Sequence, residues 1–197
     1  MKTTIFSLAA LSLMGVLVVG VGAAMSDSEW RYSHGDDDED RWEHMMRRST
    51  GVALKSSPIY VEECGSCHMA YPPGLLPSDS WRRIMADLAD HFGDNAELDE
   101  QTAQQISDFL TSNAADKSKY RRSQQMVAVV GSSTGQAAMR ITDYPYFKHE
   151  HDEVTDRLIK QSGAASLSHC NACHQRAVEG SFNEHEIWIK GLGRWDD

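Results

Sequence analysis

Residues 64–68 (CGSCH) and 170–174 (CNACH) govern the architecture of this 197-residue chain, because they hold all four of its cysteines. Both segments have the pattern C-x-x-C-H. On a helical turn, residues i, i+3 and i+4 share one face, so the two thiols and the imidazole of each motif point in one direction. This spacing allows two thioether bonds to the vinyl groups of a haem while the histidine reaches the iron, and it is the signature of c-type haem attachment.

Other roles for paired cysteines fit this spacing less well. Two C-x-x-C pairs could form a structural zinc site. One pair could be a thioredoxin-like redox centre, but that needs a βαβ pattern, and none is visible. Neither role explains a histidine directly after both pairs. The residues predicted to hold two covalently bound haem c groups are Cys64, Cys67, Cys170 and Cys173, through thioethers, with His68 and His174 as the proximal iron ligands.

The first residues indicate export. Residues 1–24 begin with a positive charge at Lys2, continue as an apolar stretch over residues 5–21 and end in small residues, which is the layout of a secretory signal peptide. An uncleaved membrane anchor is the competing interpretation, since the apolar stretch nearly reaches the ~18 residues that span a bilayer. The small residues favour cleavage, so we expect a periplasmic protein.

Composition and charge set further limits. The chain has 19 basic and 29 acidic side chains and a net charge of −10, which argues against a nucleic-acid binder. A mean hydropathy of −0.48 excludes a polytopic membrane protein. Residues 25–56 include the acidic run DDDED at 36–40, flanked by His34 and His44. We expect this segment to be a solvated, poorly ordered arm rather than a metal-capturing tail.

The remaining sequence predicts a mainly α fold with two small haem-centred domains. Apolar residues recur at helical spacing from Trp81 to Phe92, in a helix expected to start at Asp79 or Ser80 and to stop at Gly93. A second helix is expected around Leu98–Leu110, and a third from about Tyr146 to Lys160. The predicted divisions are residues 57–116 for the haem 1 domain, 117–137 for a linker and 138–197 for the haem 2 domain.

The predicted linker carries a basic patch. Its members are Lys117, Lys119, Arg121 and Arg122. The patch could dock an acidic partner or a haem propionate, but a solvated linker is the simpler interpretation.

The sixth iron ligands determine the function, because methionine or histidine gives an electron carrier and an open position gives gas or peroxide chemistry. No methionine follows Met139, so nothing after His174 can supply one to the second haem. His91 ends the apolar stripe of its predicted helix and should face the interior. We therefore predict His91 as the distal ligand of haem 1.

For the second haem, helical periodicity favours His151. On a helix, His151 shares a stripe with Phe147, whereas His149 shares a polar face with Lys160. His149 stays open as an alternative because it is so close, and His185 is the reserve candidate. His169 directly precedes Cys170 and is not expected to reach the opposite side of its own haem. The prediction is low-spin, bis-histidine iron of low potential at both sites.

Several distinctive segments surround the two motifs. They are residues 60–77 (YVEECGSCHMAYPPGLLP), Ser80-Trp81, residues 91–96 (HFGDNA), residues 140–142 (RIT), and Ala177, Gly180 and Phe182 after the second motif. Together they resemble the dihaem cytochrome c family over roughly residues 57–187. The acidic arm at 25–56 and the tail after Ile189 fall outside the likeness.

The resemblance implies an N-terminal class I cytochrome c-like domain and a smaller helical haem domain at the C-terminus. It also implies bis-histidine ligation, with His91 and His151 at the family's matching positions. Members of the family are periplasmic electron carriers associated with a small oxygen-binding haem protein and a membrane b-type cytochrome. We therefore expect redox proteins as partners, and neither a nucleic acid nor a small-molecule substrate.

The alternative function is enzymatic. A dihaem peroxidase or a gas-binding cytochrome would have one open iron, but dihaem peroxidases are considerably longer and lack the PPGLLP pattern at residues 72–77. The small dihaem subunit of periplasmic nitrate reductase also uses bis-histidine haems, but its motif surroundings differ. We predict an electron carrier that is not an enzyme.

Overall fold

The computed structural model of the protein describes residues 51–53, 55–128 and 137–195. The predicted signal peptide at 1–24 and most of the predicted acidic arm, with His34 and His44, lie outside the described residues.

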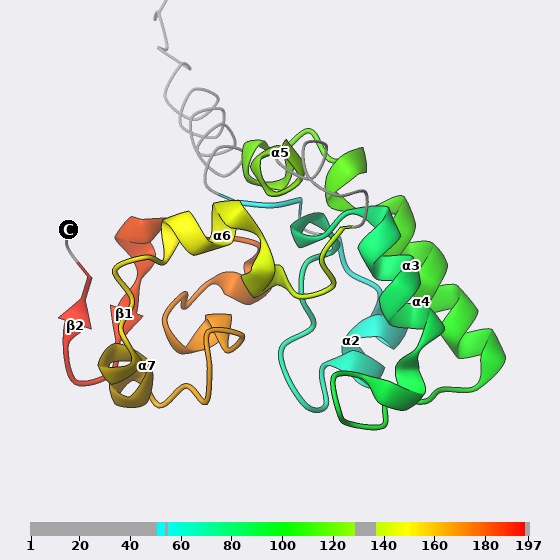
Figure 1. The fold of residues 1–197 in the computed structure, drawn as a ribbon, viewed down its shortest axis with the longest axis horizontal. Helices are drawn as coiled ribbons and strands as arrows, with labels where there is room; N and C mark the ends of the chain where they lie inside the picture. Colours follow the sequence, from blue (N-terminus) through cyan, green and yellow to red (C-terminus); the bar gives the residue numbers. More distant parts are fainter. Residues whose placement is uncertain (1–50, 54, 129–136, 196–197) are drawn as a thin grey trace, which may run out of the picture.

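Helices dominate the described part of the chain, as predicted (Figure 1). The α-helices are α2 (Pro58–Cys64), α3 (Ser78–Ala86), α4 (Glu100–Ser112), α5 (Arg121–Ala128), α6 (Pro145–Glu150) and α7 (Asp156–Ser162). The short 3₁₀ turns are η1 (Pro73–Leu75), η2 (Leu88–Asp90), η3 (Ala115–Lys117), η5 (Ile141–Asp143), η6 (Cys170–Ala172), η7 (Ala177–Glu179) and η8 (Glu184–Glu186). The strands β1 (Trp188–Ile189) and β2 (Gly193–Arg194) form a small antiparallel hairpin, with Trp188 opposite Arg194.

The two C-x-x-C-H motifs lie in different halves of the molecule (Figure 1). Helices α2, α3 and α4 form one half, and α6, α7 and the hairpin form the other. Helix α5 packs against η1, η3 and α6, so it contacts both halves of the molecule. The division into two independent domains stays a prediction.

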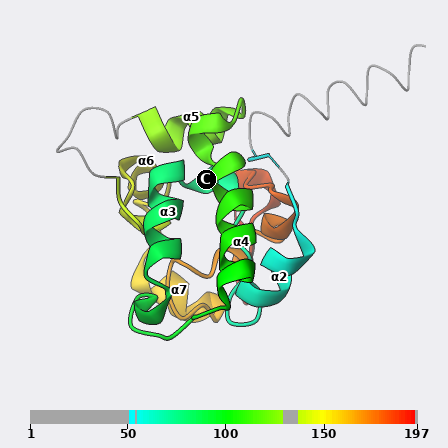
Figure 2. The same ribbon diagram turned by 90° about the vertical axis from the view of Figure 1, so that its right-hand side faces the viewer.

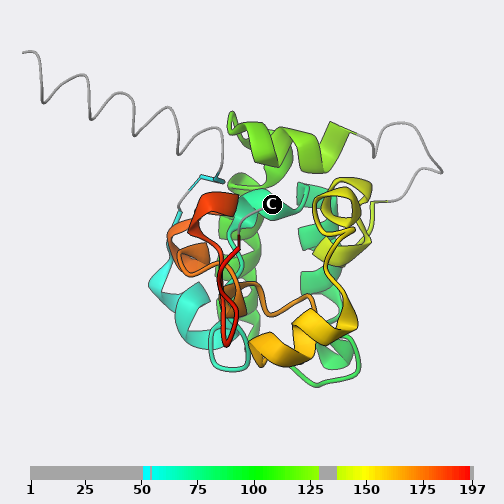
Figure 3. The ribbon, with the colours of Figure 1, turned by 90° about the vertical axis from the view of Figure 1, so that its left-hand side faces the viewer.

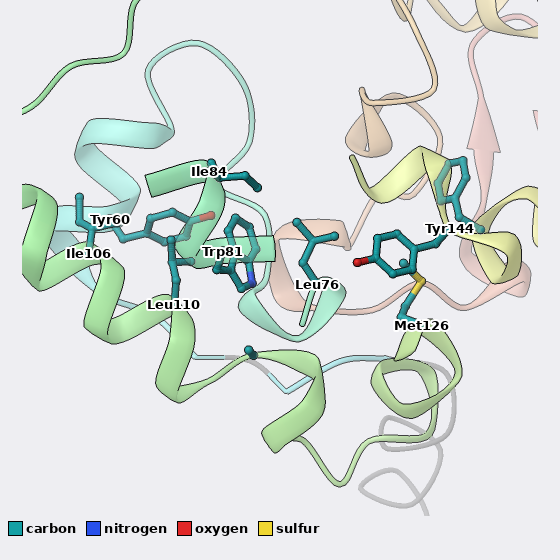
Figure 4. Close-up of a cluster of buried hydrophobic side chains, with 10 residues drawn as sticks. Tyr60, Leu76, Trp81, Ile84, Ile106, Leu110, Met126 and Tyr144 are labelled. Carbon is teal, nitrogen blue, oxygen red and sulfur yellow. The ribbon is translucent and has the colours of Figure 1, made fainter. Parts of the chain in front are cut away.

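Helix α3 packs against α4 (Figure 2). The main core begins at this contact and continues through Leu76 to Met126 and Tyr144 (Figure 4). Trp81 and Ile84 of α3, three residues apart, share an apolar cluster with Ile106 and Leu110 of α4, four residues apart. These spacings place each pair on one face of its helix. The Trp81 indole also donates a hydrogen bond of 2.8 Å to the carbonyl of Pro73, which secures η1 against α3.

A second, smaller cluster joins the two halves. We call it the junction cluster, and its members are Val52, Leu75, Ala177 and Phe182. Residues that follow or belong to the haem motifs pack against it, namely Met69, Tyr71 and Cys170, together with Ile141. The junction cluster therefore lies between the two motifs.

The helix predicted from Trp81 to Phe92 is shorter than expected. Helix α3 starts at Ser78 and ends at Ala86, and η2 follows after a break at Asp87. Phe92 (φ 60°) and Gly93 (φ 104°) then adopt left-handed backbone conformations that a helix cannot contain. The expected helix over this whole stretch is wrong, and His91 lies in a turn instead.

The helix predicted from Tyr146 to Lys160 is two helices. Helix α6 ends at Glu150, and His151 leaves the helical conformation with φ −128° and ψ 18°. Thr155 then starts α7, since its hydroxyl accepts a hydrogen bond from the Leu158 amide. The N-cap at Thr155 competes with continuation of the first helix, which is why the single helix is wrong.

The segment predicted as a linker is partly ordered in helix α5. Ser123 and Met126 of this helix are buried, and Met126 joins the main core. The described part of the segment is therefore not simply solvated chain. Residues 129–136 of the predicted linker lie outside the described residues.

Candidate haem sites

The first motif begins where α2 ends. Helix α2 places Cys64 at its last turn, and the following turn carries Cys67 and His68. The His68 ring nitrogen Nδ1 donates a 2.7 Å hydrogen bond to the carbonyl of Met69. This bond fixes the tautomer and leaves Nε2 unprotonated, which is the form that binds a metal ion. Tyr71 stacks on the same imidazole, with ring centres 4.7 Å apart.

The turn after η2 brings His91 to His68. His91 exchanges backbone hydrogen bonds with Asp94, and the left-handed conformations of Phe92 and Gly93 close this turn. The ring centres of His68 and His91 lie 6.3 Å apart, with 23° between the ring planes. A cavity of about 220 Å³ borders His91. Arg140, whose guanidinium lies 4.1 Å from the centre of the Phe92 ring, is close by.

The second site is assembled from the end of α6 and from η6. His151 stacks on Phe147, one helical turn earlier, with ring centres 4.0 Å apart, and its Nδ1 donates to the Phe147 carbonyl at 2.9 Å. His174 follows η6 at the end of the second motif. The ring centres of His151 and His174 lie 6.1 Å apart, with 68° between the planes. Phe182 meets the edge of the His174 ring at 5.5 Å.

The separation of each pair fits one metal ion between two imidazoles. Such rings have centres roughly 6 Å apart, because each nitrogen lies about 2 Å from the metal and about 1 Å from its ring centre. The pairs at 6.3 and 6.1 Å meet this requirement. Each pair combines a motif histidine with a distant histidine, so each could offer two imidazole nitrogens to one metal ion.

The second site also has room for a large apolar group. A cavity of about 350 Å³ is lined by residues of α6, α7 and the second motif. Figure 3 shows α6 and α7, in yellow tones, from this side of the molecule. His151, Cys173 and His174 line it together with Leu158 and Ile159 of α7. The Nδ1 atom of His174 is buried and has no hydrogen-bond partner among the described residues. Buried polar atoms without partners are rare, and within the described residues the His174 ring lacks the Nδ1 hydrogen bond that His68 and His151 make.

Burial favours the neutral form of three of the histidines. It lowers the pKa of His91, where the neighbouring His68 acts in the same direction. It also lowers the pKa of His151, and it lowers the pKa of His174 to about 4 with the help of His151 and Arg122. A neutral imidazole is the form that ligates iron, so these sites are prepared to bind a metal at neutral pH.

The cysteines do not have the properties of a redox dithiol. Burial raises the pKa of Cys64 to about 11, and the pKa of Cys170 also to about 11. Catalytic C-x-x-C thiols have lowered pKa values instead, because the thiolate is the reactive form. All four cysteines are free, and none of the described His, Cys, Asp and Glu side chains gather in groups of three or more that could hold a metal ion. These observations favour the thioether role over thioredoxin-like and zinc roles.

The other candidate histidines are placed differently. His149 is exposed on α6 but borders the larger cavity, so it stays an alternative to His151. His169 is also exposed and borders this cavity. His185 is exposed on η8 beside Glu184 and is not among the residues that line the cavity.

Three contributors to the sites, namely Tyr71, Phe182 and Arg122, were not assigned a role there from the sequence. Tyr71 follows the first motif and lies in the segment 60–77, which was used only for the family likeness. Phe182 was noted for the family likeness alone. Arg122, assigned to the predicted linker, lines the larger cavity and hydrogen-bonds to the Tyr146 hydroxyl at 3.1 Å. Only its positive charge could have pointed to the site.

Within the described ranges, no helix has both the length and the apolar character needed to cross a membrane.

Comparison with known proteins gives one consistent result. The sequence profile of the family "Dihaem cytochrome c" matches residues 60–182. A dihaem cytochrome c from Rhodobacter sphaeroides is 41% identical over 67% of this chain and 99% of its own, with a TM-score of 0.57. A dihaem c-type cytochrome from Shewanella baltica OS155 is 38% identical over 73% of this chain and 100% of its own, also with a TM-score of 0.57. No curated protein sequence matches the chain.

Proposed function

The chain belongs to the dihaem cytochrome c family, and we propose that it is an electron carrier that passes electrons between redox proteins through two bis-histidine haems. As a member of this family it is a c-type cytochrome with two covalently bound haem c groups. Each haem supplies an iron that alternates between the ferrous and ferric states. In the proposal, Cys64 and Cys67 attach haem 1, and Cys170 and Cys173 attach haem 2.

The observation that carries the proposal is the pairing of histidines. The ring centres of His91 and His68 lie 6.3 Å apart, and those of His151 and His174 lie 6.1 Å apart. Two imidazoles at each iron leave no position for oxygen, peroxide or another small ligand. In the absence of methionine ligands, both haems should have low potentials. These features support electron transfer over the peroxidase and gas-binding alternatives.

The hydrogen bonds of two histidines, the net charge and the N-terminal sequence support the same role. Hydrogen bonds from Nδ1 of His68 and of His151 to backbone carbonyls hold each imidazole in one tautomer and orientation, which increases its basicity toward iron. The net charge of −10 favours basic redox partners. The signal-peptide pattern at residues 1–24 supports the periplasm as the compartment.

Carbon monoxide tests whether the irons are closed. We expect the absorption spectrum of the dithionite-reduced holoprotein to stay that of a low-spin c-type cytochrome after carbon monoxide is added, because two histidines would hold each iron. A shift of the Soret band in the wild-type protein would show an open or labile iron and would overturn the proposed function.

Single substitutions test which histidines bind the two haem irons beside His68 and His174. His91→Ala and His151→Ala should each make one of the two haems high-spin and able to bind carbon monoxide, because each would remove one of the two histidines that hold its iron. His149→Ala is the matched control, since it removes an exposed histidine two residues from His151. If His149→Ala opened the second haem and His151→Ala did not, the assignment of the distal ligand would be wrong.

A further inference from the structure

Tyr71 lies between the two haem sites and contacts both. Its ring stacks on His68, with ring centres 4.7 Å apart and 25° between the planes. Its hydroxyl donates a 2.8 Å hydrogen bond to the carbonyl of Ser168, two residues before the second motif. The sulfur of Cys170 lies 3.6 Å from the same carbonyl oxygen. A continuous route of contacts therefore runs from the first proximal imidazole to the first cysteine of the second motif.

Packing holds Tyr71 in this place. Its side chain packs against both the main core and the junction cluster. Its own carbonyl accepts a 2.8 Å hydrogen bond from the hydroxyl of Tyr60, a buried residue of α2. Among the junction cluster's own members, Phe182 touches the edge of the His174 ring. Tyr71 is thus fixed by backbone, ring and hydroxyl together.

The Tyr71 hydroxyl is the donor in its bond to Ser168, because a backbone carbonyl oxygen can only accept.

We propose that Tyr71 is the positioning residue for electron exchange between the two haems, because it ties the proximal imidazole of haem 1 to the attachment loop of haem 2. The inference rests on the proposed function, since it requires two haems that carry electrons. In each exchange, one electron leaves the ferrous iron of one haem and reaches the ferric iron of the other. Tyr71 is neither oxidised nor deprotonated. Tyr71 keeps the distance between the two haems short, and electron-transfer rates fall steeply as that distance increases.

Tyr71→Phe tests the proposal, because it removes the hydroxyl and keeps the stacked ring. Tyr144→Phe is the matched control. Tyr144 is buried, its hydroxyl donates to the Ala138 carbonyl at 2.9 Å and lies 2.9 Å from Ser80 Oγ, so it too joins the part of the chain before α4 to the part after residue 137. Unlike Tyr71, it contacts neither haem motif through any bond or ring contact described above.

The measurement is exchange NMR of the haem methyl signals in half-reduced holoprotein, with the haem content of each variant checked first. We expect both variants to keep two haems and a low-spin spectrum. Tyr71→Phe should slow the exchange between haems by about threefold or more, since the hydrogen bond that joins the first haem site to the loop of the second is lost. Tyr144→Phe should leave the exchange rate as in the wild type.

The outcomes separate this inference from the function on which it rests. An unchanged exchange rate in Tyr71→Phe, or an equal slowing in both variants, would overturn the role of Tyr71. The absence of exchange in the wild-type protein would overturn it as well. Carbon monoxide binding to the wild type would instead contradict the bis-histidine carrier, and it is measured on a separate sample before any variant is made.

Discussion

Asp116 shows how a single carboxylate stabilises this fold. It accepts hydrogen bonds from the backbone amide of Ser78 at 2.7 Å and from the Ser78 hydroxyl at 2.8 Å, where α3 begins. Partial burial would raise the pKa of Asp116, but the two bonds from Ser78, together with its own backbone amide and Lys117, outweigh burial and hold the pKa below its ordinary value. Negative charge near the first turn of α3 is also favourable to the helix dipole.

Asp116→Asn should therefore destabilise the protein in a pH-dependent way. Because the pKa of Asp116 is lowered on folding, its contribution is present above the ordinary carboxyl pKa of 3.8 and is lost as the pH falls through the lower folded value. We expect a loss of about 1 kcal/mol in the free energy of unfolding at pH 7. The difference from wild type should shrink as the pH is lowered below 3.8 in denaturant titrations.

Asp108→Asn serves as the control for this experiment. Asp108 is exposed on α4 and accepts a side-chain hydrogen bond from Gln104. Its substitution should change stability little at any pH. A loss of stability in Asp116→Asn that stayed constant down to the acid limit would contradict the role given to the charge.

At the scale of single residues, the haem-binding candidates could be predicted and their supports could not. The C-x-x-C-H spacing is local, so Cys64, Cys67 and His68 follow from the sequence directly. The apolar stripes also singled out His91 and His151, which the structure brings beside the motif histidines, although ligation itself stays a prediction. The hydrogen bond from Tyr71 to Ser168 joins residues 97 positions apart, and no local sequence pattern predicts such a contact.

Among the elements, α7 forms part of the wall of the second haem site and ends in a constrained turn. Gly163 follows its last residue with φ 83°, a left-handed conformation that glycine adopts without strain. A Cβ atom built at this position would meet no heavy atom within 4 Å. Substitution effects at Gly163 therefore report backbone conformation rather than packing.

Gly163→Ala should lower the free energy of unfolding by about 1 kcal/mol, because alanine is strained at this φ. Gly163→Asn is the matched comparison, since asparagine tolerates the left-handed region better than alanine. We expect the asparagine variant to lie between alanine and wild type in denaturant unfolding followed by circular dichroism. Equal stability of the alanine variant and the wild type would contradict the strain argument.

The helices also differ in how well the sequence predicts where they begin and end. Helix α4 was predicted because Ile106 and Leu110 lie one turn apart and face the core. The break after α6 was missed, although Thr155 followed by an acidic residue is a recognisable helix start. The apolar spacing predicts a helix through His91, because it continues past the true end of α3 at Ala86. Periodicity alone does not show where tertiary contacts end a helix.

For the whole molecule, the dominant electrostatic property is the net charge of −10. A surface with this charge attracts basic partners over distances set by the ionic strength. The screening length falls from about 30 Å at 0.01 M salt to about 8 Å at 0.15 M. Association with a partner should therefore depend strongly on salt.

We expect the second-order rate of electron transfer to a small basic redox protein to fall by about tenfold between these two salt concentrations. Stopped-flow absorption of the haem bands measures the rate. An acidic redox protein of similar size is the control, and its rate should rise with salt as repulsion is screened. A rate with the basic partner that did not change with salt would contradict electrostatic docking.

The contact between Tyr71 and Ser168 also bears on the order in which the protein is assembled. Helices and the attachment motifs are local and form early, whereas a contact across 97 residues closes a long loop and must overcome its entropy. The two cysteine motifs are therefore accessible, separate segments before this loop closes. Maturation can load each segment with its haem independently, and closing of the loop then completes the folded protein.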